Sequence, residues 1–220
     1  LALIHIAHPK FREELMEQAR ARNFVYKDQI VSVGFGAPEL EEMESTLTLA
    51  DDTVLHFRPI SPADEDMIRD LFYSYSEETV LHRFFRHVPA MPHEDLQKLI
   101  EVDYSKDMIL VAIAPQGAGE MIVAVGRYHI QPATGAAEVA FSMRDDWQRK
   151  GIGTHLFRQL IEIARNRGVT TFVAEVMVDN VGMINLFHKC ALGPVQSILQ
   201  DGAYHFSFDL PPSVVARESR

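Results

Sequence analysis

The chain has 220 residues, of which 47% are hydrophobic and 24% are charged, proportions typical of a soluble globular domain. Its net charge of −10 argues against general nucleic-acid affinity and suits a cationic partner such as an amine, although solubility alone also accounts for it. No apolar run is long enough to span a membrane, and a single cysteine, Cys190, excludes an intrachain disulfide, so we expect a cytoplasmic protein with no membrane partner.

Residues 1–50 are predicted to be an N-terminal appendage and linker. Phe11, Leu15 and Ala19 recur at four-residue spacing, which predicts an amphipathic helix over 10–22, whereas the Gly, Pro and acidic residues of 27–50 indicate a linker with limited structure. The run IAHPKFREEL (residues 6–15) resembles the C-terminal end of acetyl-CoA hydrolase/transferase enzymes. This resemblance implies a preceding CoA-transferase domain in a longer parent chain. The start at Leu1 rather than Met indicates a fragment or a processed chain. A plain surface helix is the alternative.

From Thr53 the pattern becomes that of a compact α/β domain, which we place at residues 51–210, before a C-terminal tail at 211–220. Alternating or β-branched runs predict strands, and amphipathic runs predict helices. In chain order we expect a strand over 53–58, helices over 62–73, 77–87 and 93–102, strands over 108–114, 121–130 and 136–143, a helix from 153 that stops at Gly168, a strand over 169–178, a helix over 180–190, and strands over 194–199 and 203–209. This order predicts a mixed sheet flanked by helices.

The most informative segment is QRKGIGT (residues 148–154), between a predicted strand and a predicted helix. The first N–H groups of a helix have no partner inside it and carry the positive end of its dipole, so a glycine-rich turn at this point predicts a phosphate site. A Walker A loop does not fit, because Gly153 is followed by Thr154 and His155, and the dinucleotide fingerprint fails because Leu156 takes the third glycine position. An ordinary strand-to-helix turn is the alternative.

The remaining pattern, Q-x-x-G-x-G-T, resembles the acyl-CoA pyrophosphate loop of the GNAT superfamily of N-acetyltransferases, over roughly residues 53–210. The resemblance implies a GNAT-type α/β fold with a mostly antiparallel sheet, acetyl-CoA as cosubstrate and no metal. It also implies that the strand before the loop binds the pantetheine arm through the backbone of Phe141 and Met143. The pyrophosphate would be held by the residues of the loop, Gln148, Arg149, Lys150, Gly151, Ile152, Gly153 and Thr154.

An acidic residue, Glu138, stands inside the apolar run AEVAF (residues 137–141). Acetyl transfer to an amine requires a base, because only about one lysine side chain in 2,500 is neutral at pH 7. The run resembles the corresponding strand of bacterial GNAT protein-lysine acetyltransferases, in which this glutamate is the general base. An exposed strand-edge glutamate is the alternative, and Glu175, on the next predicted strand, is a weaker competitor.

Two helical segments add to the resemblance. DNVGMINLFHK (residues 179–189) is similar to the family pattern N-x-x-A/M-x-x-L-Y-x-K, so Asn180 would cap the helix and help to fix the CoA arm, and Phe187 would lie beside the cofactor. Many members have at the Phe187 position a tyrosine that protonates the departing thiolate, which phenylalanine cannot do. LHRFFR (residues 81–86) resembles the acceptor-side helix, so Arg83 would help to shape the amine entrance; core aromatics flanked by surface basic residues are the alternative.

These observations predict an enzyme that transfers the acetyl group of acetyl-CoA to a primary amine, with a protein lysine as the preferred acceptor. A small amine, such as a polyamine or an amino acid, is the alternative acceptor. A non-catalytic acyl-CoA sensor is the alternative of a different class, favoured by Phe187 and by the apparent fusion to a CoA-using enzyme. His82, His87 and His93 are close in sequence, but no cysteine or carboxylate pattern completes a metal site.

Overall fold

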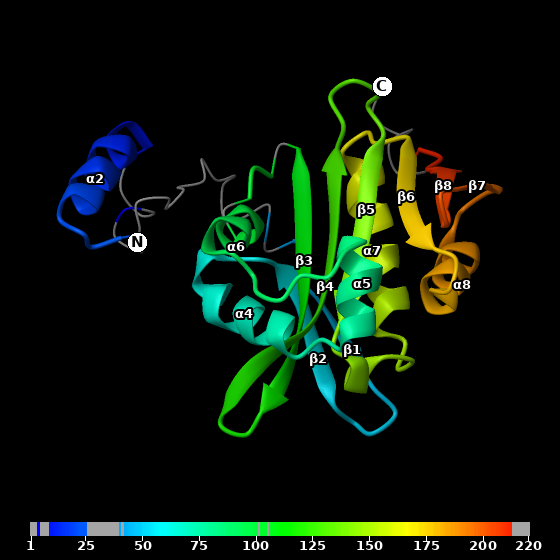
Figure 1. Ribbon diagram of the computed structural model, residues 1–220, viewed down its shortest axis with the longest axis horizontal. Coiled ribbons are helices and arrows are strands. Elements are labelled where there is room, and N and C mark those ends of the chain that lie inside the picture. Colours follow the sequence, from blue (N-terminus) through cyan, green and yellow to red (C-terminus); the bar gives the residue numbers. More distant parts are fainter. Residues whose placement is uncertain are drawn as a thin grey trace.

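The computed structural model describes residues 4, 9–25, 40, 42–100, 102–104 and 106–212. Helix α2 (Pro9–Ala21) confirms the helix predicted over 10–22 and lies apart from the remaining elements, which surround one sheet (Figure 1). Part of the predicted linker and most of the predicted tail, 27–39 and 213–220, lie outside the described residues.

In the described part of the chain, the strands form one sheet in the order β1-β2-β3-β4-β5-β6-β8-β7. Every neighbouring pair is antiparallel except β5 and β6, which are parallel. The predicted mixed, mostly antiparallel sheet is therefore confirmed. The strands are β1 (Ser45–Thr48), β2 (Val54–Pro59), β3 (Asp107–Gln116), β4 (Gly119–Ile130), β5 (Ala137–Met143), β6 (Thr171–Met177), β7 (Val195–Gln200) and β8 (Ala203–Asp209).

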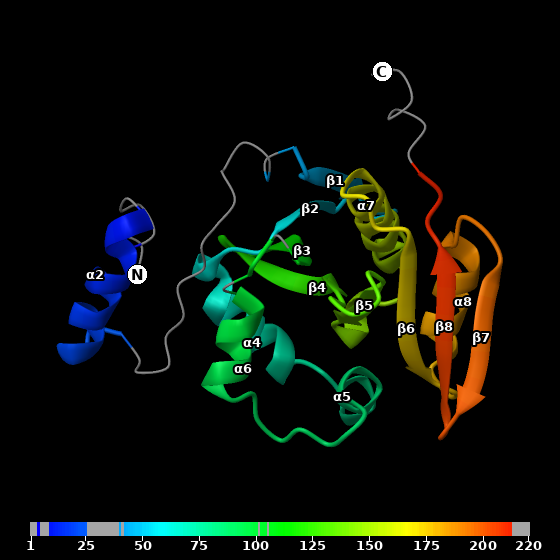
Figure 2. The ribbon, with the colours of Figure 1, turned by 90° about the horizontal axis from the view of Figure 1, so that it is seen from above.

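Helices cover the sheet on both sides, as Figure 2 shows from above. One side carries α4 (Glu65–Tyr73), α5 (Glu77–Phe84) and α6 (His93–Ile100), and the other carries α7 (Ile152–Asn166). Helix α8 (Val181–Cys190) packs on α7, and short 3-10 turns precede α4 (Pro62–Asp64) and α7 (Asp145–Trp147). The predicted helices are thus present, with most ends shifted by a few residues, as is usual for helix boundaries.

Strand β1 differs from the prediction, because it lies inside the segment predicted to be a linker. Its pairing with β2, from Ser45 opposite Phe57 to Thr48 opposite Val54, extends the sheet by one strand. Ser45 Oγ also lies 2.9 Å from Nε2 of His155 and donates a hydrogen bond of 3.1 Å to Gln159, both on α7. These contacts join residues far apart in sequence, so the local pattern of four residues gave no sign of them.

The core between α7 and the sheet is tightly packed. Leu156, Leu160 and Ala164 form the predicted apolar face of α7, and each is at most 1% exposed. Gly126 on β4 lies directly beneath this face: a Cβ atom added there would come within 2.8 Å of Leu156 and 2.9 Å of Phe141. The absence of a side chain at Gly126 therefore allows α7 to approach β4 closely.

Candidate acyl-CoA site

Strands β5 and β6 separate soon after they start. They pair at two positions, Ala137 with Phe172 and Glu138 with Val173, whereas β5 stays paired with β4 along its whole length. From Val139 to Met143, the β6-facing backbone of β5 therefore has no strand partner within the described part of the chain. Ligands of α/β sheets bind at the carboxyl ends of strands where neighbouring strands part, and free backbone amides at such a place can bind an extended ligand.

The turn that follows β5 leads into the N-terminus of α7. The first bond of the helix runs from the N–H of His155 to the carbonyl of Gly151, 3.1 Å away, so the N–H groups of Ile152, Gly153 and Thr154 have no partner inside the helix. Arg149 and Gly151 both have positive φ angles, 62° and 87°, which curl the turn around these amides. Such a turn at a helix N-terminus favours an anion, and the exposed side chains of Arg149 and Lys150 add positive charge.

Three elements meet at the turn. A Cβ atom added to Gly153 would contact Leu186 of α8 at 3.6 Å and Met143 of β5 at 3.7 Å, so the end of β5 and the start of α7 lie against α8. Asn180 caps α8, as predicted, by accepting a hydrogen bond of 3.1 Å from the N–H of Met183. The unpaired edge of β5 and the N-terminus of α7 thus form one continuous surface.

Phe187 lies in the aromatic core rather than at this surface. It is 1% exposed, and its ring centroid lies 5.2 Å from that of Phe157 and 5.5 Å from those of Phe206 and Phe208. Its predicted contact with a cofactor remains a prediction. As a core residue, Phe187 has a clear structural role that requires no hydroxyl group.

Asp145 connects the turn to the opposite side of the sheet. Its carboxylate accepts hydrogen bonds from the N–H of Ser76 at 2.9 Å, from the hydroxyl of Ser76 at 3.1 Å, from Thr79 at 2.6 Å and from Gln148 at 3.3 Å. Partial burial raises the pKa of Asp145, but the bonds from Thr79 and Ser76 outweigh this effect and hold it below its ordinary value. Asp145 therefore fastens the start of α5 to the turn.

Replacing Asp145 with alanine is expected to lower the free energy of unfolding at pH 7 by about 1–2 kcal/mol, because several hydrogen bonds to a charged group are lost. Urea denaturation measures this change. Because its pKa is depressed in the folded state, Asp145 contributes stability above its ordinary pKa, and the contribution disappears as pH falls through the folded pKa. Asp146→Ala is the control, since that neighbouring carboxylate makes one 3.5 Å contact with Arg144. Equal losses in both variants would contradict the assigned role.

Glu138 lies where β5 and β6 part, on the side of the sheet away from α7. Its side chain is exposed, and its nearest hydrogen-bond partner is Gln131 at 3.5 Å. Residue 138 shares this side with Arg127 of β4, because Arg127 pairs with Ala140 and side chains two residues apart on a strand point to the same side. Glu175 lies on the same side, two residues beyond Val173 on β6.

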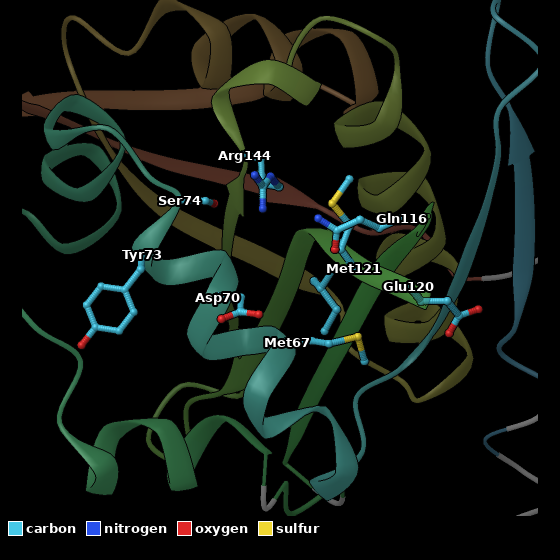
Figure 3. A pocket seen from close by; sticks show the side chains of 9 residues that line it. Met67, Asp70, Tyr73, Ser74, Gln116, Glu120, Met121 and Arg144 are labelled. Carbon is cyan, nitrogen blue, oxygen red and sulfur yellow. The ribbon is translucent and has the colours of Figure 1, made fainter. Parts of the chain in front are cut away.

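A separate cavity of about 310 Å³ lies between α4 and the β3–β4 hairpin (Figure 3). Asp70, Glu120 and Met67 line it, and its one link to the turn is Arg144, which follows the last residue of β5. The described residues include no group of three or more His, Cys, Asp or Glu side chains placed to hold a metal ion. None of the described helices is long and apolar enough to cross a bilayer.

Comparison with known proteins identifies the family to which this fold belongs. The profile of the acetyltransferase (GNAT) family matches residues 66–192. The chain belongs to the GNAT family. This match covers the unpaired edge of β5, the turn before α7 and both carboxylates, Glu138 and Glu175. The fold predicted from the Q-x-x-G-x-G-T pattern is therefore confirmed.

Individual relatives agree with the GNAT assignment. Acetyltransferase Pat of Mycolicibacterium smegmatis is 33% identical over 158 residues, which are 71% of this chain and 46% of that protein. This chain thus spans less than half the length of that relative. The GNAT domain of S. lividans PAT superposes with a TM-score of 0.69 at 27% identity, over 80% of this chain and all of that domain. The fold is shared with yncA of Salmonella typhimurium, solved with its cofactor acetyl-CoA, at 18% identity and a TM-score of 0.55, over 73% of this chain and 96% of that one.

The structure adds two residues, Asp145 and Arg127, to the surroundings of the predicted site. The sequence does not single out Asp145, because its partners, Ser76 and Thr79, are more than 60 positions away. Arg127 did give a signal, since it is a charged residue inside the apolar run MIVAVGRYHI, which is the same pattern that drew attention to Glu138.

Proposed function

We propose that this GNAT domain transfers the acetyl group of acetyl-CoA to a primary amine, with Glu138 as the general base. One observation carries the proposal: β5 and β6 part at Glu138, and the unpaired edge of β5 leads directly to the free N–H groups at the start of α7. The residues fit acyl-CoA, because an unpaired strand edge suits the amide groups of a pantetheine arm and the turn suits a pyrophosphate.

In the proposed reaction, the carboxylate of Glu138 accepts a proton from the acceptor ammonium group, directly or through water. The neutral nitrogen then attacks the thioester carbonyl carbon, and the carbon–sulfur bond breaks to release the CoA thiolate. The nitrogen loses its second proton to water or to the thiolate, which leaves the neutral amide. An unperturbed thiol has a pKa of about 8.5, so the thiolate is a good leaving group that water can protonate. A hydroxyl group at position 187 is then dispensable, in agreement with the burial of Phe187.

Several findings support the proposal. The family match and the acetyltransferase relatives support N-acetyl transfer, and the acetyl-CoA complex of yncA supports the cosubstrate. A protein lysine as acceptor rests on the resemblance of the AEVAF strand to protein-lysine acetyltransferases. The length of the Mycolicibacterium relative leaves room for further domains in a parent chain, and a CoA-transferase domain before residue 51 remains a proposal from the IAHPKFREEL run alone.

A sensor that binds acetyl-CoA without turnover is the second candidate, and Phe187 is the observation that favours it. Release of CoA thiol from acetyl-CoA separates the two functions. The acceptors should include a lysine-rich protein, the same protein with its lysines reductively dimethylated, spermidine and free amino acids. We expect release with the unmodified protein and none above background with the dimethylated one.

Release with spermidine or amino acids alone would instead assign a small-amine acetyltransferase. Thermal stabilisation by acetyl-CoA must be measured beside the assay, since about 2.7 kcal/mol is expected at 100 times the dissociation constant. Stabilisation without thiol release for any acceptor would favour the sensor. Neither stabilisation nor release would contradict both functions.

A further inference from the structure

Helix α5 covers the side of the sheet that carries Glu138. Tyr75, just before the helix, donates a hydrogen bond of 2.8 Å to Ser142 of β5, and Ser76 and Thr79 bind Asp145. Near the other end of the helix, His82 Nε2 lies 3.1 Å from Oδ1 of Asp179, beyond the end of β6. The helix is therefore fastened to both strands that part at Glu138, and it lies against β5 in Figure 1.

Two guanidinium groups lie on this covered side. Arg127 is partly buried on β4, on the same side as Glu138, and Arg83 is partly buried on α5, next to His82. Burial is the main cause that lowers the pKa of Arg83 to about 10; the charge of Arg127 acts in the same direction, and Tyr75 and Glu138 act in the opposite direction. The group therefore remains charged at pH 7, within the electrostatic field of both Arg127 and Glu138.

Neither guanidinium group has a hydrogen bond or an ion pair with any residue that the structure describes; Arg83 makes one cation–π contact, with its carbon 5.3 Å from the ring centre of Phe84. Two partly buried cations that repel each other thus lie on the side of the sheet that carries Glu138. Burying a cation without a partner is costly, and arginine forks bind carboxylates through paired hydrogen bonds. An anion bound by Arg83 and Arg127 would supply the partner that both groups lack among the described residues.

We propose that Arg83 and Arg127 bind a carboxylate of the acceptor molecule, next to the amine that Glu138 deprotonates. This inference rests on the proposed function and narrows its substrate class. An acidic side chain beside a protein lysine and the α-carboxylate of a free amino acid supply the same chemistry. The phosphates of CoA are not the expected anion, because the amides that suit them lie beyond Met143, at the start of α7 on the opposite side of the sheet.

Matched acceptor pairs test the inference. The peptide Gly-Asp-Lys-Gly is compared with Gly-Asn-Lys-Gly, and free lysine with lysinamide, by the kcat/KM of thiol release. We expect the carboxylate to raise kcat/KM at least about tenfold in one pair, because a hydrogen bond to a charged group has about that effect. The peptide pair identifies a protein acceptor, and the lysine pair identifies a small amino acid.

Single variants then test whether Arg83 and Arg127 cause the preference for a carboxylate. Arg83→Gln and Arg127→Gln should each reduce the carboxylate preference to nearly onefold, and Arg86→Gln, an exposed arginine just beyond α5, should leave it unchanged. The dissociation constant of acetyl-CoA, measured by calorimetry, should not change in any of the three. A preference that persists in both site variants, or its absence in both pairs, would overturn the inference. Weaker acetyl-CoA binding in the site variants would also overturn it, because the anion would then belong to CoA.

If no acceptor supports thiol release, the proposed function fails and the inference is decided by binding alone. Titration of the CoA-saturated protein with the aspartate and asparagine peptides, and with lysine and lysinamide, then takes the place of the rate. Tighter binding of one carboxylate ligand that disappears in Arg83→Gln would support the anion site. Equal affinities within both pairs would overturn it.

Discussion

Replacing Glu138 with glutamine is expected to lower kcat/KM for the amine by about 10²–10⁴-fold, the usual contribution of a positioned general base. The two side chains are nearly identical in size, so the strand and its pairing with His129 and Val173 should be kept. Acetyl-CoA should bind with an unchanged dissociation constant, because its proposed contacts lie with the backbone of β5 and the turn. Thiol-release kinetics and calorimetry measure the two quantities.

The pH profile adds a second, independent result. Without a base, the Glu138→Gln variant depends on amine that is already neutral, so its rate should rise with pH up to the amine pKa, near 10.4 for lysine. Glu175→Gln is the control, because Glu175 is another exposed carboxylate on the same side of the sheet, paired with His205. A tenfold or greater loss of activity in the Glu175 variant, with full activity in the Glu138 variant, would make Glu175 the general base instead of Glu138.

The order of strands and helices could be predicted because each element carries a strong local pattern. Helix α7 shows an apolar face at helical spacing, and β3 is an almost continuous apolar run that the structure buries. Strand β1 could not be predicted in this way. It is four residues long, and its place in the sheet depends on β2 and on the contacts of Ser45 with α7.

The sequence singles out a candidate site residue where that residue conflicts with its local pattern. Glu138 is an acid in an apolar strand, and the Gly151–Gly153 turn interrupts a strand-to-helix transition. Arg127 shows the same conflict, yet its meaning depends on Arg83, which the folded chain brings to it from another element. The sequence alone cannot show that Arg83 and Arg127 lack an anionic partner, because that depends on which residues the fold places beside them.

Replacing Asp64 with alanine is expected to destabilise the domain by about 3–5 kcal/mol, the usual result of removing one partner of a buried ion pair. Both oxygens of Asp64 accept hydrogen bonds of 2.7 Å from the guanidinium group of Arg58, and one also accepts a 2.8 Å bond from the N–H of Ser61. The carboxylate is 2% exposed, and the side chain of Arg58 is 27% exposed. The variant therefore leaves a partly desolvated cation and removes the acceptor of the Ser61 N–H, so one half of the capping box is lost.

Thermal denaturation should show a fall in Tm on the order of 10 °C for Asp64→Ala. Asp66→Ala is the matched control, because Asp66 also accepts a short bond, 2.8 Å from Arg69, but its side chain is 89% exposed. Water and salt screen such an exposed pair, so its loss should cost less than about 1 kcal/mol. Similar shifts in the two variants would mean that burial adds nothing to the Arg58–Asp64 pair. A large difference would show that β2 and α4 are joined through a pair whose strength depends on exclusion from water.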